Sequence, residues 1–162
     1  MVLPWDRLGM SHVLLAPHPD KNMCSTAPTI LSAVQQTLSA HGASSVTVVG
    51  HSLGAALALL DSVYFRAQLN ASVRVQMVGY GLPRVGNQDF ANWVDSKLSG
   101  QVTHINNEED PIPIVPGKFL GFHHPSGEVH ITDSGTWEIC PGELFSSLLS
   151  PRRVCGLGFS GC

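Results

Sequence analysis

The sequence of 162 residues lacks three features that mark common functional classes. It has no long hydrophobic run, because the longest, residues 55–60, is far shorter than the roughly 20 residues of a membrane-spanning helix. It has no lysine and arginine cluster and a formal net charge of −3, so no basic surface for nucleic acid is expected. It has no Cys-x-x-Cys pair, which excludes the usual zinc spacing. Its length and its apolar fraction of 43% are those of a single globular domain.

The first residues and the cysteines bear on cellular location. Asp6 and Arg7 interrupt the opening apolar residues before the core of a signal peptide can form. We therefore expect a cytosolic protein, or a secreted one whose start is missing from this sequence. A glycosylation sequon at Asn70 is compatible with secretion. Four cysteines, three of them near the C-terminus, favour an oxidising compartment: Cys24, Cys140, Cys155 and Cys162.

The sequence does contain a glycine-flanked serine between a strand pattern and a helix pattern. Gly50-His-Ser-Leu-Gly54 follows a valine-rich run and precedes an alanine- and leucine-rich segment. This is the context of a G-x-S-x-G nucleophile elbow, in which the serine projects from a strained turn between strand and helix. We expect side chains at both glycines to collide with the neighbouring strand and helix. The alternative is an ordinary tight turn that contains a serine.

Strand and helix patterns alternate along the chain, which predicts βαβ units and an α/β fold with a central, mostly parallel sheet flanked by helices. Pro28 fits the first turn of a helix, Gly42 a C-terminal cap and Asn87 an N-terminal cap. After Gly117, short strands separated by turn residues predict an antiparallel edge. The predicted helices cover 25–41, 53–68 and a segment after Asn87, and the predicted strands 13–16, 45–49, 73–81, 101–106, 119–122, 129–132 and 136–139. The predicted inner face of the helix at 25–41 consists of Ile30, Leu31, Val34 and Leu38. That of the helix after Asn87 consists of Phe90, Trp93, Val94 and Leu98.

Four motifs in a fixed order resemble one known family. They are Thr-Val-Val-Gly-His-Ser-Leu-Gly-Ala-Ala-Leu-Ala (47–58), Gly-Tyr-Gly-Leu-Pro-Arg-Val-Gly-Asn (79–87), Thr-His-Ile-Asn-Asn-Glu-Glu-Asp-Pro-Ile-Pro-Ile-Val-Pro (103–116) and Phe-His-His-Pro-Ser-Gly-Glu-Val-His-Ile (122–131). Residues 25–142 are similar to the fungal class 3 lipases, between a poorly matched segment (1–24) and a divergent tail (143–162). The resemblance implies a partial α/β-hydrolase fold and an extracellular protein.

The resemblance also implies hydrolysis of carboxylic esters, typically acylglycerols at a lipid–water interface, without a metal or an organic cofactor. Ser52 matches the family nucleophile and Asp110 the acid of the triad, in the chain order that this fold requires. The Leu53 N–H would donate to the oxyanion. Glu108 and Glu109 fit exposed loop positions, and the alternative for Asp110 is a solvated turn residue.

The sequence departs from the family pattern at the catalytic base. The family's histidine lies near the C-terminus, after a Cys-Pro-Gly segment, whereas no histidine follows His130 here. His123 or His124 could take its place from the end of a strand. The other histidines are expected to be structural or on the wrong side of the elbow: His12, His18, His41, His51, His104 and His130. The first residues lack the family's lid and second oxyanion donor. These differences predict a truncated or misassembled form of a longer lipase, with poor solubility.

Three alternatives stay open. The chain could be a catalytically impaired or inactive lipase-like remnant, including a binding protein. It could be a feruloyl-type esterase on the same fold, because the lid and pocket that separate the two activities are not recognisable here. A serine peptidase shares only the elbow. The expected disulfide pairs Cys140 with Cys155, without a clear partner for Cys24 or Cys162.

Overall fold

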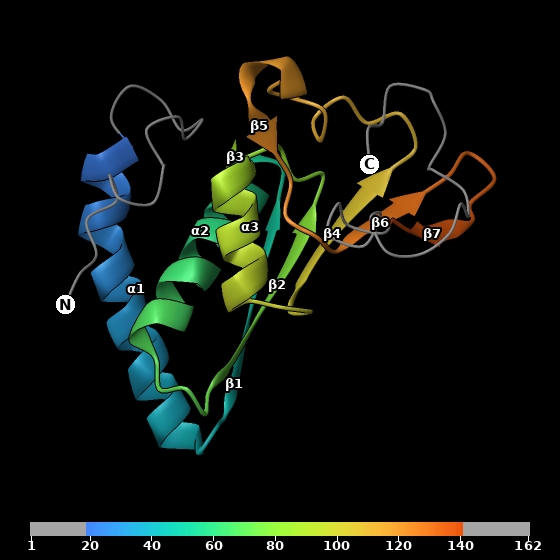
Figure 1. The fold of residues 1–162 in the computed structure, drawn as a ribbon. Helices are drawn as coiled ribbons and strands as arrows, with labels where there is room; N and C mark the ends of the chain where they lie inside the picture. Colours follow the sequence, from blue (N-terminus) through green and yellow to red (C-terminus); the bar gives the residue numbers. More distant parts are fainter. Residues whose placement is uncertain (1–18, 141–162) are drawn as a thin grey trace.

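The computed structural model describes the backbone of residues 19–140 and the side chains from Thr26 onward (Figure 1). Three α-helices, one short 3₁₀ helix and seven strands follow in chain order. They are α1 (Pro19–His41), β1 (Ser45–His51), α2 (Leu53–Gln68), β2 (Arg74–Tyr80), β3 (Gly86–Asn87), α3 (Gln88–Lys97), β4 (Val102–Asn107), η3 (Lys118–Leu120), β5 (Phe122–His123), β6 (Glu128–Ile131) and β7 (Trp137–Ile139).

A five-stranded sheet in the order β1-β2-β4-β6-β7 forms the centre of the molecule (Figure 1). The first three pairings are parallel, and β7 is antiparallel to β6. A separate antiparallel pair joins β3 to β5. The α/β class with a mostly parallel sheet, helices against it and short antiparallel strands near the C-terminus is therefore confirmed. The carboxyl ends of β1, β2 and β4 meet at one end of the sheet, where α/β folds place their sites.

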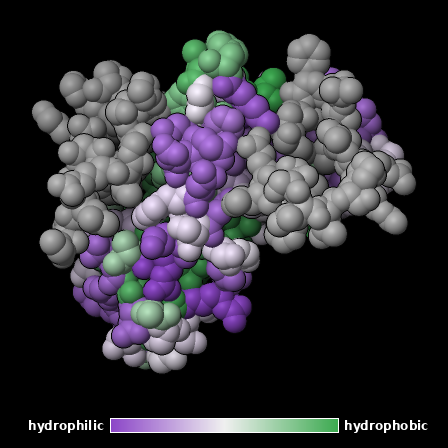
Figure 2. Space-filling model, viewed as in Figure 1, coloured by the Kyte–Doolittle hydropathy of each residue, from purple (hydrophilic) through white to green (hydrophobic). Residues whose placement is uncertain are grey.

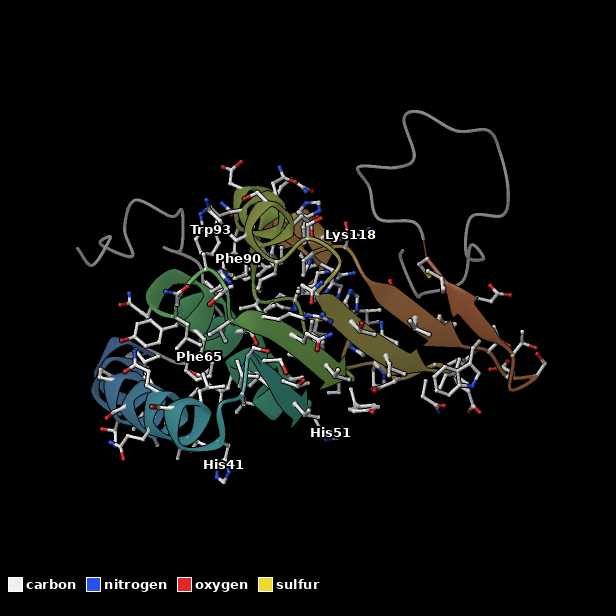
Figure 3. All side chains as sticks on the ribbon, turned by 90° about the horizontal axis from the view of Figure 1, so that it is seen from below. His41, His51, Phe65, Phe90, Trp93 and Lys118 are labelled. Atoms are coloured by element: carbon white, nitrogen blue, oxygen red, sulfur yellow. The ribbon has the colours of Figure 1, made fainter. Side chains whose placement is uncertain are left out.

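The helices cover one face of the sheet. Val75 and Met77 from β2 and Val102 from β4 share one buried cluster with Leu59 of α2 and Phe90 of α3. Phe65 and Phe90 lie among the helices on this side, whereas His41 and His51 lie at the outer margin (Figure 3). The opposite face of β1 is exposed at alternate residues, and β1 has one strand neighbour within residues 19–140.

Most predicted elements are present with shifted ends. The helix of residues 53–68 and the side-chain cap of α3 are confirmed: Asn87 Oδ1 accepts from the Phe90 N–H at 2.9 Å. The C-terminal cap of α1 at Gly42 is confirmed too, at a φ of 59°. α1 starts at Pro19 rather than at residue 25, so Pro28 lies inside the helix, and the prediction that it occupies the first turn is wrong. Proline is well tolerated at the first helical position, which Pro19 occupies. The predicted strand 13–16 lies outside the described residues.

Two other details of the prediction are wrong. Ile30 is exposed, because the buried stripe of α1 runs through Ala27 and Leu31 and Ile30 lies beside it. Residues 118–120 form the 3₁₀ turn η3 instead of a strand, and Gly121 ends it in the left-handed region. The strand expected at 129–132 is β6, which is parallel to β4, so β7 forms the one antiparallel pairing within the five-stranded sheet of the described residues. Over residues 19–140, no helix is both long and apolar enough to cross a lipid bilayer.

Candidate active site

Ser52 occupies the turn between β1 and α2 in a strained conformation. Its φ of 54° and ψ of −124° lie where residues with a side chain are rarely found, at a cost of about 1–3 kcal/mol. The Ser52 N–H donates to the Tyr80 carbonyl at 2.9 Å, which fixes the turn to the carboxyl end of β2. The side chain is partly exposed. The turn thus holds a serine hydroxyl at the end of the sheet, as the elbow pattern predicts.

Only one of the two elbow glycines is needed for space. A Cβ at Gly50 would lie 2.1 Å from the Gly54 carbonyl oxygen and 2.7 Å from the Ala55 nitrogen. The first turn of α2 can therefore pack against residue 50 only if that residue has no side chain. A Cβ at Gly54 would meet no heavy atom within 4 Å. The prediction that both glycines avoid a collision is therefore wrong for Gly54, whose hydrogen points to open space in the described structure.

The first turn of α2 leaves a backbone donor beside the serine. The N–H groups of Ala55 and Ala56 donate to the Ser52 carbonyl at 2.9 and 3.3 Å. The Leu53 N–H precedes these and belongs to the first turn, where a helix offers its own N–H groups no acceptor. An N–H at this position, reinforced by the positive end of the helix dipole, suits a developing oxyanion.

Asp110 lies close to the same end of β2. Its Oδ1 accepts from the Ile112 N–H at 2.9 Å, which folds the loop after β4 into a tight turn. A Cβ at Gly81 would lie 2.8 Å from Asp110 Oδ2, so the carboxylate rests against the residue that follows Tyr80. Ser52 therefore contacts Tyr80, the last residue of β2, and Asp110 contacts Gly81, the residue after it. Glu108 and Glu109 are exposed, as expected.

A buried arginine secures the loop that carries Asp110. The Arg84 side chain is 3% exposed, and its Nη1 donates to the Ile114 carbonyl and, at 2.8 Å, to the Pro116 carbonyl. Its backbone N–H donates to the Val115 carbonyl at 2.9 Å. Burial lowers the pKa of Arg84, while the nearby charge of Glu128 acts in the opposite direction. One residue of the loop after β2 thus holds three consecutive carbonyls of the segment after Asp110.

Two stacked histidines contact this segment and the residues after β5. His124 Nε2 lies 2.8 Å from the Pro113 carbonyl and His104 Nε2 lies 3.1 Å from the Pro125 carbonyl. Because a carbonyl only accepts, both Nε2 atoms carry the hydrogen. The rings stack at 4.9 Å between centroids. Burial, followed by the neighbouring His104, lowers the pKa of His124 to about 3, and burial lowers the pKa of His104. The His124 ring is therefore neutral and its Nε2 hydrogen is engaged by the Pro113 carbonyl, which disfavours the alternative that His124 serves as the base.

The remaining described histidines lie at the end of α1 and on β1, β5 and β6. His51 and His41 point outward (Figure 3), and His123 in β5 pairs with Gly86 of β3. His130, on β6, lines a small depression together with Asp110, Asn106 and His124. β6 is three strands from β1, so His130 lies beyond Asp110 as seen from Ser52. His12 and His18 lie outside the described residues. Within the described part of the chain, no group of histidine, cysteine and acidic side chains could hold a metal ion.

Sequence reasoning missed the supporting residues Arg84 and His124. A signal existed for Arg84, because it is the one charged residue in the otherwise apolar Leu82–Val85 loop. His124 was considered from the sequence as a possible base and not as a support of the segment after Asp110. Cys140 is disulfide-bonded, and the side chains of its possible partners, Cys155 among them, lie outside the described ones.

Comparison with known proteins places this site in a family. The model of the class 3 lipases matches residues 11–120. A secreted mono- and diacylglycerol lipase of Malassezia globosa is 43% identical over 102 residues, which cover 62% of this chain and 33% of that lipase. A second such lipase of the same organism is 36% identical over 130 residues, covering 78% of this chain and 42% of the relative.

Solved structures agree with these relatives. Lipase II from Rhizopus niveus superposes with a TM-score of 0.64 at 31% identity, over 76% of this chain and 49% of that one. A triacylglycerol lipase with a serine-protease triad superposes with a TM-score of 0.59 at 36% identity. The match covers 67% of this chain and 41% of that lipase. The chain thus spans less than half the length of the relatives it matches. The matched family model and these likenesses confirm the expected resemblance, and the chain belongs to the class 3 lipase family.

Proposed function

We propose that this chain carries the core of an ester hydrolase that acts on acylglycerols through an acyl-enzyme at Ser52. The observation that carries the proposal is the strained Ser52 turn, hydrogen-bonded to Tyr80 beside the Asp110 carboxylate. The strain is useful only if the hydroxyl must project from the end of the sheet. The names of the relatives, secreted mono- and diacylglycerol lipases, suggest the substrate class and an extracellular location.

In the proposed reaction, Ser52 Oγ attacks the ester carbonyl while an imidazole removes its proton and returns it to the leaving alcohol. The Leu53 N–H donates to the oxyanion of the tetrahedral intermediate. Asp110 orients the imidazole and stabilises its protonated form. Water then hydrolyses the acyl-enzyme and releases the fatty acid.

The imidazole is the component to test, because His104 and His124 donate to backbone carbonyls and His130 lies beyond Asp110. Free imidazole in solution should therefore accelerate acylation of Ser52. We expect a fluorophosphonate probe to label the chain slowly without imidazole and at least about tenfold faster with it, since general bases typically contribute ~10²–10⁴-fold.

The experiment is labelling of the full chain, with the adduct located by mass spectrometry. Ser52→Ala should abolish labelling, and Ser99→Ala, at an exposed serine after α3, should leave it unchanged. The chain that has not met the probe should also release nitrophenol from a short-chain nitrophenyl ester in a burst, and prior labelling of Ser52 should remove that burst. A cooperatively folded chain that stays unlabelled even with imidazole would show a non-catalytic member of the family instead.

A further inference from the structure

The glycosylation sequon of the sequence lies in the connection between α2 and β2. Asn70-Ala-Ser72 belongs to residues 69–73, which we call the 69–73 turn. Asn70 is the only asparagine of the sequence that is followed two residues later by serine or threonine. Asn70, Ala71 and Ser72 are all exposed. The one Asn-x-Ser/Thr acceptor of an N-linked glycan therefore lies on the surface of the folded chain.

The 69–73 turn has a defined conformation. The Val73 N–H donates to the Asn70 carbonyl at 3.0 Å, and Arg66 Nη1 donates to the Val73 carbonyl at 2.9 Å. Asn70 Oδ1 accepts from the Ser72 N–H at 2.9 Å and from the Ser72 hydroxyl at 3.0 Å. These side-chain bonds use only the oxygen of the amide, and Nδ2 takes no part in them. A sugar attached to Nδ2 would therefore leave the turn intact.

Beside the turn lies a shallow hollow with room for sugar residues. It has a volume of about 370 Å³ and is formed by the ends of α2 and α3 and the start of β2. Ser72, Arg74, Lys97 and Ser99 contribute to its wall and are exposed. Hydroxyl, guanidinium and ammonium groups can all form hydrogen bonds with sugar hydroxyls. The folded chain can thus accommodate a large polar group at this place.

The 69–73 turn lies at the end of the sheet opposite the candidate site. Ser52 follows β1 at its carboxyl end, whereas the turn precedes β2 at its amino end, where the Arg74 N–H donates to the Ser44 carbonyl at 2.9 Å. Figure 1 shows this connection at the lower end of the molecule. In Figure 2 the lower end is mostly purple to white, and the larger hydrophobic area lies at the top, over η3. A glycan on the turn would therefore leave Ser52 open.

We propose that Asn70 is an N-glycosylation site whose glycan projects from the amino end of the sheet. The proposal rests on the proposed extracellular location, because the donor is an oligosaccharide carried on a lipid diphosphate in the secretory pathway. In the transfer, Asn70 Nδ2 attacks C1 of the first sugar. The Nδ2–C1 bond forms, the bond from C1 to the diphosphate oxygen breaks, the lipid diphosphate leaves, and a base of the transferase takes up one Nδ2 proton. The Ser72 hydroxyl orients the amide through Oδ1.

The test is expression of the full chain behind a cleavable secretion leader in a eukaryotic host, with medium and cell extract both analysed by mass spectrometry. We expect an added mass that peptide N-glycosidase removes, and removal in heavy-oxygen water should mark Asn70. Asn70→Gln and Ser72→Ala should each abolish this mass. Ser72→Thr should keep it, since threonine also carries the required hydroxyl.

The matched control is Asn92→Gln, because Asn92 is exposed on α3 and has no hydroxyl side chain two residues later. This variant should keep the full modification. A chain without the glycosidase-sensitive mass in both fractions would overturn the proposal. The same holds if that mass persists in Asn70→Gln.

The position of the glycan has its own readout. With imidazole present, glycosylated chain and Asn70→Gln should be labelled at Ser52 by the fluorophosphonate at rates within about twofold, since the two ends of the sheet act independently. A larger difference would contradict a glycan that points away from the candidate site. Failure of the proposed function gives a different result, because Ser52 would then stay unlabelled in both forms while Asn70 is still modified.

Discussion

At the residue scale, the two elbow glycines have opposite surroundings. A Cβ at Gly50 would meet backbone atoms at 2.1 Å, whereas one at Gly54 meets nothing within 4 Å. We expect Gly50→Ala to destabilise the fold by at least about 3 kcal/mol, because the start of α2 must move. Gly54→Ala should be neutral or stabilising by up to about 1 kcal/mol, since alanine favours a helix over glycine.

Urea unfolding followed by circular dichroism measures both variants. The pair is its own control, because each adds one methyl group to a glycine of the same turn. Equal destabilisation by the two substitutions would show that the elbow is not packed as described. If Gly54→Ala destabilises the fold and Gly50→Ala does not, other parts of the protein must approach residue 54.

At the element scale, the histidine stack joins β4 to the segments on either side of β5. The folded chain keeps His124 neutral down to a pKa of about 3, whereas the unfolded chain takes up this proton near pH 6.5. The unfolded state therefore binds more protons between these values, and the stability from neutral His124 is lost as pH falls below about 6.5. His124→Gln, which can still donate to the Pro113 carbonyl, should flatten the loss by up to about 1.4 kcal/mol per pH unit.

The measurement is the free energy of unfolding in urea at several pH values between about pH 4 and pH 8. His41→Gln serves as the control, because His41 is exposed at the end of α1 and should leave the profile unchanged. His104 contributes in the same direction, so the glutamine variant should retain part of the slope. A profile identical to that of the original chain would contradict the role assigned to the stack.

The elements also show what the sequence can predict. The ends of α2 were predicted to the residue, because a glycine turn precedes it and its apolar pattern is continuous. η3 was misassigned as a strand, because Phe119 and Leu120 are apolar although neither packs into the core. Apolar pattern indicates burial in most chains, so an exposed apolar tip gives the wrong signal.

The candidate site was predictable only residue by residue. Ser52 and Asp110 were identified by motif, but their common position at Tyr80 and Gly81 depends on the strand order β1-β2-β4. Periodicity along the chain carries no information on that order. The role of Arg84 depends on carbonyls about thirty residues away, which no local pattern reveals.

At the scale of the whole molecule, the helices cover one face of the sheet and leave the edge strand β1 exposed on the other. Val49 on that face is 61% exposed, and β1 has no second strand neighbour within residues 19–140. An unpaired edge with apolar residues promotes association between chains. We therefore expect the isolated 162-residue chain to form oligomers in a concentration-dependent way.

Val49→Lys should shift this equilibrium toward the monomer, because a lysine on an edge strand resists pairing and must stay in water. Size-exclusion chromatography with light scattering over a range of concentrations measures the shift. Leu57→Lys is the control: Leu57 is a partly exposed apolar residue on α2, on the covered side of the sheet, and its substitution should leave the oligomer in place. If the original chain is monomeric at every concentration, the edge is covered by other parts of the protein. If both lysine variants dissociate the oligomer equally, added charge and not the edge of β1 explains the effect.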